Sequence, residues 1–173
     1  LLCLLLMLSI SSCRKNFSTM PSIGMLEFSK DTVFLDTIFT NIGSATYNLK
    51  VYNRGNDDIT IPAISLERGL DSNYRLNVDG IPGKDFENID ILSKDSIFIF
   101  IETTVNVASV SNPLYTDRIL FDTGMNRQGV DLVTLVQDAN FIYPGRDPLT
   151  LKIDSLALNG QPTTIRGRFL TND

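Results

Sequence analysis

The sequence contains no histidine and no tryptophan, and its two cysteines, Cys3 and Cys13, both lie close to the N-terminus. Without histidine, neither a Ser-His-Asp triad nor a Cys-His nucleophilic pair can form. The usual zinc sites of cysteine and histidine are excluded, and two N-terminal cysteines provide no disulfide framework for a domain. Only carboxylates, lysine, tyrosine, serine and threonine remain for catalysis. We therefore expect a protein with no enzymatic activity, no cofactor and no metal.

Positive charge is also scarce. The chain has 15 lysines and arginines against 20 aspartates and glutamates, which gives a formal net charge of −5. The longest basic run is Arg14-Lys15. Binding to the phosphates of nucleic acid requires clustered basic side chains. The composition therefore predicts that nucleic acid is not a partner.

The N-terminal segment is a short apolar run, "LLCLLLML", that ends on small residues. It is shorter than the roughly 20 apolar residues that span a bilayer, and the pattern is typical of a secretory signal peptide. Ile10-Ser11-Ser12-Cys13 resembles a bacterial lipobox, whose cysteine receives lipid and becomes the first residue after cleavage. The resemblance implies that residues 1–12 are a signal peptide lacking its first few residues, and that Cys13 is the lipidation site. A buried N-terminal element of a cytosolic protein is the alternative, and the polar residues 11–15 fit it poorly.

A lipid anchor at Cys13 implies a location in the cell envelope, held by several acyl chains because one chain alone binds membranes weakly. Arg14 does not resemble an inner-membrane retention signal, so we expect the outer membrane. No acidic run follows Cys13, and the periplasmic and surface faces both remain open. Residues 13–24 are polar and contain Pro21 and Gly24, which is typical of a tether.

Residues 25–139 have the pattern of short strands separated by turns. Tyr47, Leu49 and Val51 alternate with polar residues, as in a half-buried strand. Pro62 predicts that its strand lies at an edge or is broken, and the run "IFIFI" predicts a central strand, apolar on both faces. We expect about seven strands, which points to an all-β, immunoglobulin-like antiparallel β-sandwich. The expected strands cover 32–40, 46–53, 58–67, 74–79, 95–105, 117–123 and 129–137.

The stretch "VYNRGNDDITI" (51–61) resembles the strand-Asn-x-Gly-turn-strand signature of the ASH/MSP-like immunoglobulin sandwiches. The resemblance implies that Asn53 and Gly55 form a turn, and that Ile59 and Ile61 lie on the inward face of the next strand. The wider run "DTVFLDTIFTNIGSATYNLKVYN" looks like the opening of a group of Gram-negative envelope lipoproteins. These proteins carry such a sandwich after the lipobox, often followed by a right-handed parallel β-helix.

Residues 140–173 differ from the sandwich in composition. A linker-like seam, "NFIYPGRDPL", precedes two strand-like pieces around Asn159-Gly160, a dipeptide that favours hairpin turns. About 30 residues are too few for a core of their own. We therefore expect a strand-rich C-terminal extension that begins a further, truncated domain.

Two local patterns suggest chemistry. Asp122-Thr123-Gly124 matches the triplet of aspartic proteases, although Met125 departs from the residue that follows there, and the triplet also suits a hairpin turn. The acidic segments 54–58 and 84–90 offer oxygen ligands for Ca²⁺, but neither matches a defined calcium loop. Solvated loop carboxylates are the simpler interpretation.

Asp-Ser/Thr-aliphatic triplets resemble the acceptor pattern of O-glycosylation systems in some Gram-negative envelopes. They make candidate acceptors of Thr32, Thr37, Ser96 and Ser155.

The sequence leaves two functional hypotheses. The first is a membrane-anchored envelope lipoprotein whose non-catalytic sandwich is an interaction or spacer domain. It would contact an envelope protein or polysaccharide through edge strands or loops. The alternative is the N-terminal accessory domain of a larger β-helix protein that acts on or binds polysaccharide.

Overall fold

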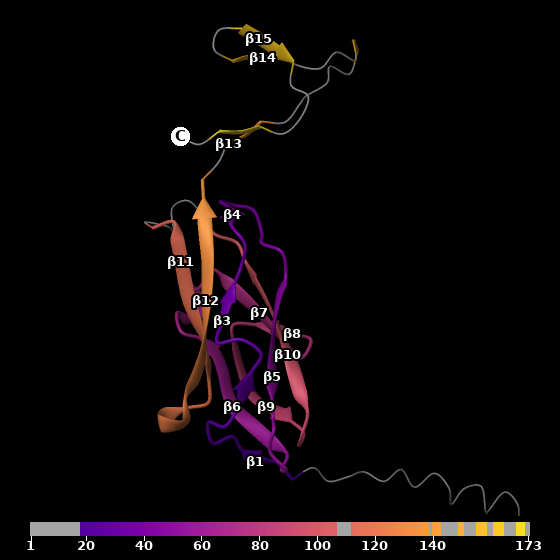
Figure 1. The fold of residues 1–173 in the computed structure, drawn as a ribbon, viewed down its shortest axis with the longest axis vertical. Coiled ribbons are helices and arrows are strands. Elements are labelled where there is room, and N and C mark those ends of the chain that lie inside the picture. The colour runs from indigo at the N-terminus through magenta and orange to yellow at the C-terminus, as the bar shows by residue number, and fades with distance from the viewer. Residues whose placement is uncertain are drawn as a thin grey trace, which may run out of the picture.

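The computed structural model describes residues 18–106, 112–138 and 149–150, together with the backbone of four short C-terminal strands. Two β-sheets pack face to face (Figure 1). Within this part of the chain the helical elements are two 3₁₀ turns, η2 (Gly69–Asp71) and η4 (Gly124–Asn126), and no helix is long and apolar enough to cross a bilayer. The predicted all-β, immunoglobulin-like sandwich is confirmed.

One sheet has seven strands and the other has five. The seven-stranded sheet contains β1 (Met20–Pro21), β6 (Ile59–Leu66), β11 (Leu114–Phe121), β12 (Gln128–Gln137) and β3 (Thr32–Phe34) in that order, with β9 (Asp85–Ile91) beside β6 and β4 (Ile38–Phe39) beside β12. The five-stranded sheet contains β2 (Glu27–Phe28), β5 (Tyr47–Tyr52), β10 (Ser96–Thr103), β7 (Tyr74–Val78) and β8 (Ile81–Gly83).

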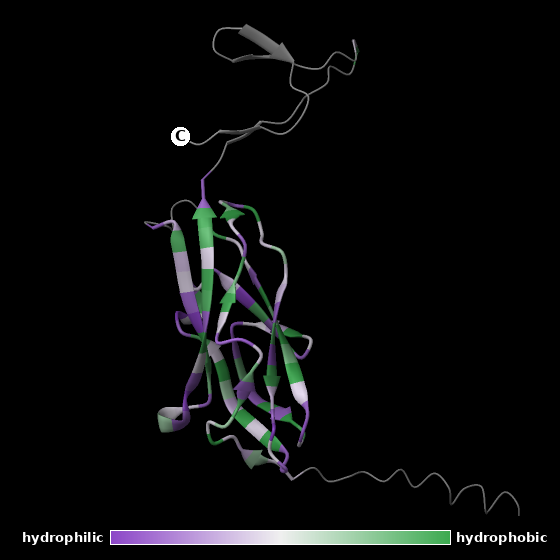
Figure 2. Ribbon diagram, viewed as in Figure 1, coloured by the Kyte–Doolittle hydropathy of each residue, from purple (hydrophilic) through white to green (hydrophobic). Residues whose placement is uncertain are grey.

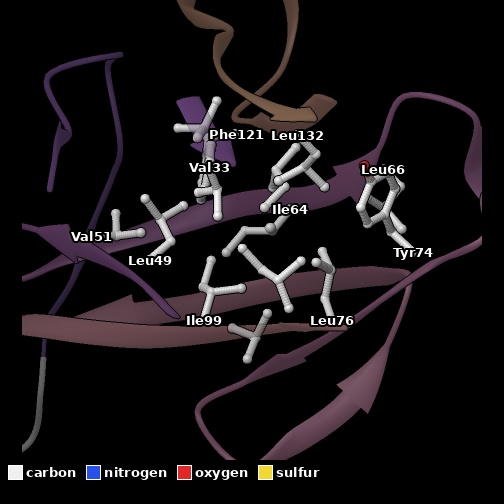
Figure 3. Packing of buried hydrophobic residues seen from close by; sticks show 14 of the residues in the cluster. Val33, Leu49, Val51, Ile64, Leu66, Tyr74, Leu76, Ile99, Phe121 and Leu132 are labelled. Carbon is white, nitrogen blue, oxygen red and sulfur yellow. The ribbon is translucent and has the colours of Figure 1, made fainter. Parts of the chain in front are cut away.

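A single apolar core lies between the two sheets. Figure 3 shows Leu49 and Ile99 of the five-stranded sheet beside Ile64 and Leu132 of the other, and all four side chains are fully buried. Along the strands, hydrophobic and polar residues alternate (Figure 2), as expected when one face packs on a core. Burying each large apolar side chain contributes roughly 1.5–3 kcal/mol, so this core is the main source of stability.

Strand β10 is central, as predicted, because it pairs with β5 on one side and β7 on the other. Its second face is not covered among the described residues. Ile97, Ile99 and Ile101 point into the core, whereas Phe98 and Phe100 on the opposite face are 46% and 42% exposed. The isoleucines of this apolar run therefore lie in the core, and its phenylalanines lie on the outer face of the sheet.

Two of the turns between strands are tight hairpins, and one of them includes a strand that the sequence did not indicate. β11 and β12 pair antiparallel on either side of the turn at 122–127. β7 and β8 pair around Asp79 and Gly80, whose φ angles are 49° and 86°. A two-residue hairpin turn requires positive φ at such positions, and Asp-Gly provides it.

Three details of the predicted strand pattern are wrong. The segment 32–40 forms two short strands, β3 and β4, and both pair in parallel with β12. β1 also pairs in parallel with β6, so the sandwich is not wholly antiparallel. β6 is one continuous strand inside the sheet, with β9 on one side and β11 and β1 on the other, although Pro62 itself has no partner in any of these ladders. Proline removes one donor but leaves its carbonyl, and the β6–β9 register is the same before and after Pro62.

The acidic segment 84–90 is also not a loop, since most of it forms the edge strand β9. Phe86 and Ile91 reach the core, while the charged residues Asp85, Glu87 and Asp90 are all exposed. Exposed charges on an edge strand oppose unwanted pairing with other chains. The acidic composition of this segment therefore suits its place at the edge of the sheet.

The second half of the expected tether, residues 18–24, belongs to the folded domain. Met20–Pro21 pairs with Ile59 and Thr60 of β6. Ser22 is buried and donates a hydrogen bond from Oγ to Asp122 Oδ2 at 2.8 Å. This polar stretch finds hydrogen-bond partners in the edge of β6 and in Asp122. Composition alone does not reveal these contacts. Residues 13–17 lie outside the described part of the chain.

In the C-terminal extension, the backbone forms two strand pairs. β14 (Ser155–Leu158) pairs antiparallel with β15 (Gln161–Thr164), and Leu158 faces Gln161. This pairing confirms the hairpin expected around Asn159-Gly160. β13 (Asn140–Ile142), expected as linker, pairs with β16 (Phe169–Thr171). The further domain stays a prediction.

The Asn53–Gly55 turn is formed as the resemblance implied, and Asn53 is its centre. Its buried side chain accepts a hydrogen bond from Gly55 N and donates to the carbonyls of Asp57, Ile91 and Leu92. Ile61 is fully buried, and Ile59 packs against the core from a half-buried position. One amide thus joins the turn after β5 to the end of β9.

We predict that Asn53→Ala lowers the free energy of unfolding by about 3 kcal/mol, because buried backbone groups lose their partners. Asn53→Asp should cost more, since a carboxylate oxygen would replace the amide donor and face the carbonyls. Asn56→Ala, an exposed position in the same turn, should change stability by less than about 0.5 kcal/mol. Urea unfolding followed by circular dichroism measures all three, and equal stability of the two alanine variants would contradict the assignment.

Candidate interaction surface

The structure does not bring the predicted site residues together. Cys13 lies outside the described residues. Thr32 is half-buried in β3, Ser96 is half-buried at the start of β10, and Thr37 is exposed between β3 and β4. Ser155 lies in β14, where only the backbone is described. O-glycosylation stays a prediction, and Thr37 is the most accessible of the three acceptors whose side chains are described.

Asp122-Thr123-Gly124 opens the β11–β12 turn, in agreement with the hairpin-turn interpretation of this triplet. Asp122 and Gly124 have φ angles of 63° and 60°, and the buried Asp122 carboxylate accepts the Ser22 hydroxyl. Asp122 therefore holds the N-terminal segment against the turn.

The acidic turn 54–58 also has structural contacts. Asp58 Oδ1 accepts a hydrogen bond from Ser93 N at 2.8 Å. In the described part of the chain, no group of three histidine, cysteine, aspartate or glutamate side chains is arranged to hold a metal ion.

The outer face of the five-stranded sheet carries a row of alternating aromatic and cationic side chains. We define this aromatic ladder as Phe100, Phe98, Lys50, Tyr52 and Arg54. The Phe98 and Phe100 rings are stacked, with centroids 6.2 Å apart and planes 16° from parallel. Lys50 Nζ lies 5.1 Å from the ring centroids of both Phe98 and Tyr52, and Arg54 Cζ lies 4.0 Å from that of Tyr52.

Strand pairing explains how the ladder assembles. Lys50 on β5 is the direct partner of Phe98 on β10, and Tyr52 is the partner of Ser96. Directly paired residues in neighbouring strands project from the same face of a sheet. At one end, Arg54 forms a 3.2 Å ion pair with Glu27, and the hydrogen bond to Glu27 raises the pKa of the guanidinium. Both side chains are exposed, so this pair adds little stability.

Polar groups surround the other end of the ladder. Phe100 is paired with Asn48 on one side and Asn77 on the other, and Asn77 is paired with Pro82. Asn77 Oδ1 is buried and makes no hydrogen bond within the described protein. Nearby, Arg75 and Glu102 form a 3.6 Å ion pair.

These residues line a shallow groove of about 310 Å³, the Phe100 groove. An aromatic face beside a few placed polar groups can hold a flat, partly polar ligand. The lining consists of Thr46, Arg75, Leu76, Asn77, Pro82, Phe100 and Glu102.

The sequence does not indicate the ladder directly, because the apolar run in 95–105 is typical of a strand that is buried on both faces. A signal was present. Isoleucine occupies positions 97, 99 and 101, while phenylalanine alternates with it at 98 and 100. Of the cationic partners, Lys50 lies in β5 and Arg54 in the turn after it. The ladder therefore depends on strand register, which the sequence does not specify.

No protein-family model and no curated protein matches the chain. Among solved structures, it is similar to a family 123 glycoside hydrolase from Clostridium perfringens, with a TM-score of 0.44 and 9% identity, over 65% of this chain and 27% of that one. It is also similar to the E. coli chaperone DraB, with a TM-score of 0.39 and 11% identity, over 88% and 83% of the two chains. The periplasmic chaperone SfaE gives 0.37 and 13%, over 84% and 86%. At these values the likeness gives no information on function.

We predict that the ladder phenylalanines contribute little to folding. Replacing Phe98 and Phe100 together by threonine, which keeps strand propensity, should lower the free energy of unfolding by no more than about 1.5 kcal/mol. Ile99→Ala, between them in the same strand, should cost about 2–5 kcal/mol because it leaves a cavity in the core. Thermal and urea unfolding provide the comparison. A larger loss for the double variant than for Ile99→Ala would mean that the ladder is structural.

Proposed function

We propose that this protein is a cell-envelope lipoprotein, anchored in the outer membrane through Cys13, whose sandwich is a non-catalytic interaction or spacer domain. The observation that carries the proposal is the aromatic ladder on a domain whose core packing leaves it exposed. Large aromatic side chains on a surface are typical of contact sites for partners. Within residues 18–106 and 112–138, the two buried aspartates have structural contacts. Asp117 Oδ1 accepts from Arg68 N and Arg118 N, and Asp122 Oδ2 accepts from Ser22 Oγ, while the second oxygen of each carboxylate is buried without a hydrogen bond.

The anchor is supported by the lipobox-like Ile10-Ser11-Ser12-Cys13 and by the short distance along the chain from Cys13 to the fold. Ser18 is the first described residue, and β1 begins at Met20. A lipid on Cys13 would therefore hold the domain next to the membrane, with the ladder available along its side.

The test of the anchor is fractionation of cells that express the full chain. We expect the wild-type protein and Cys3→Ala to sediment with outer-membrane vesicles and to carry the mass of the acyl groups. Cys13→Ala should lose both properties, because no thiol remains to accept lipid. Cys3→Ala is the matched control, since it removes the other cysteine from the same segment. Identical partitioning of the Cys13 and Cys3 variants would overturn the proposal.

The Phe100 groove favours a second candidate, an accessory domain of a larger protein that acts on or binds polysaccharide. The ring of Phe100, the half-buried Asn77 side chain and the Arg75–Glu102 pair form an apolar platform edged with polar groups. A sugar presents one apolar face and a rim of hydroxyl groups, so it matches this arrangement. The net charge of −5 favours a neutral glycan over an acidic one.

Affinity electrophoresis tests this candidate, with full-length protein run in gels that contain neutral polysaccharides. We expect at least one gel to retard the wild-type protein, and Phe100→Thr and Asn77→Ala to abolish the retardation. Leu135→Ala, on the other sheet and 40% exposed, should migrate like the wild type. Retardation that persists in both groove variants, or no retardation in any gel, would count against polysaccharide binding.

A further inference from the structure

An apolar surface lies at the end of the sandwich where the N-terminal segment joins it. We define this N-terminal end as Met20, Ile23, Met25 and Met125, with the surface between them. Met20, Ile23 and Met25 are 51%, 65% and 77% exposed, and Met125 is fully exposed. Met20, Ile23 and Met25 border a hollow of about 530 Å³ that extends to Arg54 and Ile59. Isolated exposed apolar residues are ordinary, but several around one hollow indicate a contact surface.

The fold holds these side chains outward. Met20 N donates to Asp58 O and Ser22 N donates to Thr60 O, which fixes β1 on the edge of β6. The buried Ser22–Asp122 hydrogen bond then ties the segment to the turn that carries Met125. Gly24 packs so closely on this turn that an added Cβ would lie 2.7 Å from Asn126 O. The apolar side chains therefore project from a braced segment.

The position of Cys13 along the chain favours a membrane as the partner of this surface. Cys13 precedes Met20 by seven residues, and seven extended residues reach at most about 25 Å. If lipid on Cys13 enters a bilayer, the N-terminal end is the part of the domain within this reach. The opposite end, where β12 finishes, is farther away along the strands (Figure 1).

The charges at this end are mixed and suit a lipid headgroup region. Arg54, Lys94 and Arg127 are exposed there, and Lys94 Nζ donates to Arg54 O. Asp57 is exposed in the same turn as Arg54. Exposed apolar side chains with basic residues beside them can enter the headgroup–acyl boundary, to a depth of roughly 5–10 Å.

We propose that the N-terminal end is a membrane-contact surface, so that the lipid anchor and the Met20, Ile23, Met25 and Met125 side chains together seat the domain on the bilayer. This inference rests on the lipid anchor of the proposed function. It adds a second contact, which fixes how the domain stands on the membrane.

The absence of tryptophan from the sequence makes a direct test possible. Single tryptophans are introduced into the full-length, lipidated protein as Met25→Trp, Met125→Trp and, as the control, Leu114→Trp at the opposite end, where Leu114 is 50% exposed. Each variant is reconstituted into vesicles of phosphatidylethanolamine and phosphatidylglycerol, with or without brominated acyl chains. Flotation with the vesicles and intact mass establish anchoring before fluorescence is measured.

We expect brominated lipid to remove at least about half of the emission of the tryptophans at 25 and 125, with a shift to shorter wavelength, because they enter the headgroup–acyl boundary. The tryptophan at 114 should be unaffected by bromination and quenched by iodide in water. Anchored protein in which all three tryptophans respond alike would overturn the membrane-contact surface and leave the anchor intact. Protein that lacks the acyl mass and does not float would instead overturn the proposed function.

Discussion

The fold depends on one constraint, which is that each strand must place every second side chain in the core between the sheets. β10 shows the consequence most clearly. Ile97, Ile99 and Ile101 point inward and are buried, and the pleat then forces Phe98 and Phe100 outward. A register shift of one residue would exchange these two sets and place the rings in space filled by isoleucines. The exposed aromatic surface is thus a direct result of the packing that stabilises the domain.

Buried polar groups make this packing specific. The Tyr74 hydroxyl is fully buried, donates to the Tyr115 carbonyl at 3.1 Å and lies 2.9 Å from Thr134 Oγ1. Burial raises the pKa of Tyr74 to about 12, so its hydroxyl keeps its proton and remains a donor even in alkaline solution where an exposed tyrosine ionises. Tyr74 joins β7 to β11 and β12 of the other sheet, as Asn53 joins the turn after β5 to β9. Such contacts favour one relative placement of the two sheets, which apolar contacts alone leave less defined.

The sequence predicts the sandwich well where its strands are long enough to show a period. The hairpin of β11 and β12, the central place of β10 and the Asn53–Gly55 turn follow from alternation and turn chemistry. β1 and β2 have two residues each, so neither contains a period, and each exists because a longer neighbour offers a free edge. The acidic composition of β9 suggests a loop, but it reflects charges at the edge of a sheet. Pro62 is tolerated in β6 because one missing donor does not end a strand. The ladder and the N-terminal end combine residues far apart in sequence, so only strand register brings them together.

The ladder lies along the side of the domain, whereas the N-terminal end lies at one end of its strands. The two surfaces therefore face different ways, which matters for the proposed function. The strands run between the N-terminal end and the end where β12 finishes (Figure 1). A domain seated on its N-terminal end would therefore hold its strands away from the membrane. It would present Phe98 and Phe100 sideways, while Arg54, the last residue of the ladder, would lie at the membrane-facing end. The aromatic rings would then remain available for a partner, since the apolar residues of the N-terminal end make the contacts with the bilayer. A flexible tether alone would let either surface meet the lipid. On this proposal the braced segment 18–24 would separate a membrane-facing surface from a partner-facing one, and the Ser22–Asp122 hydrogen bond would help to set the orientation of the whole domain.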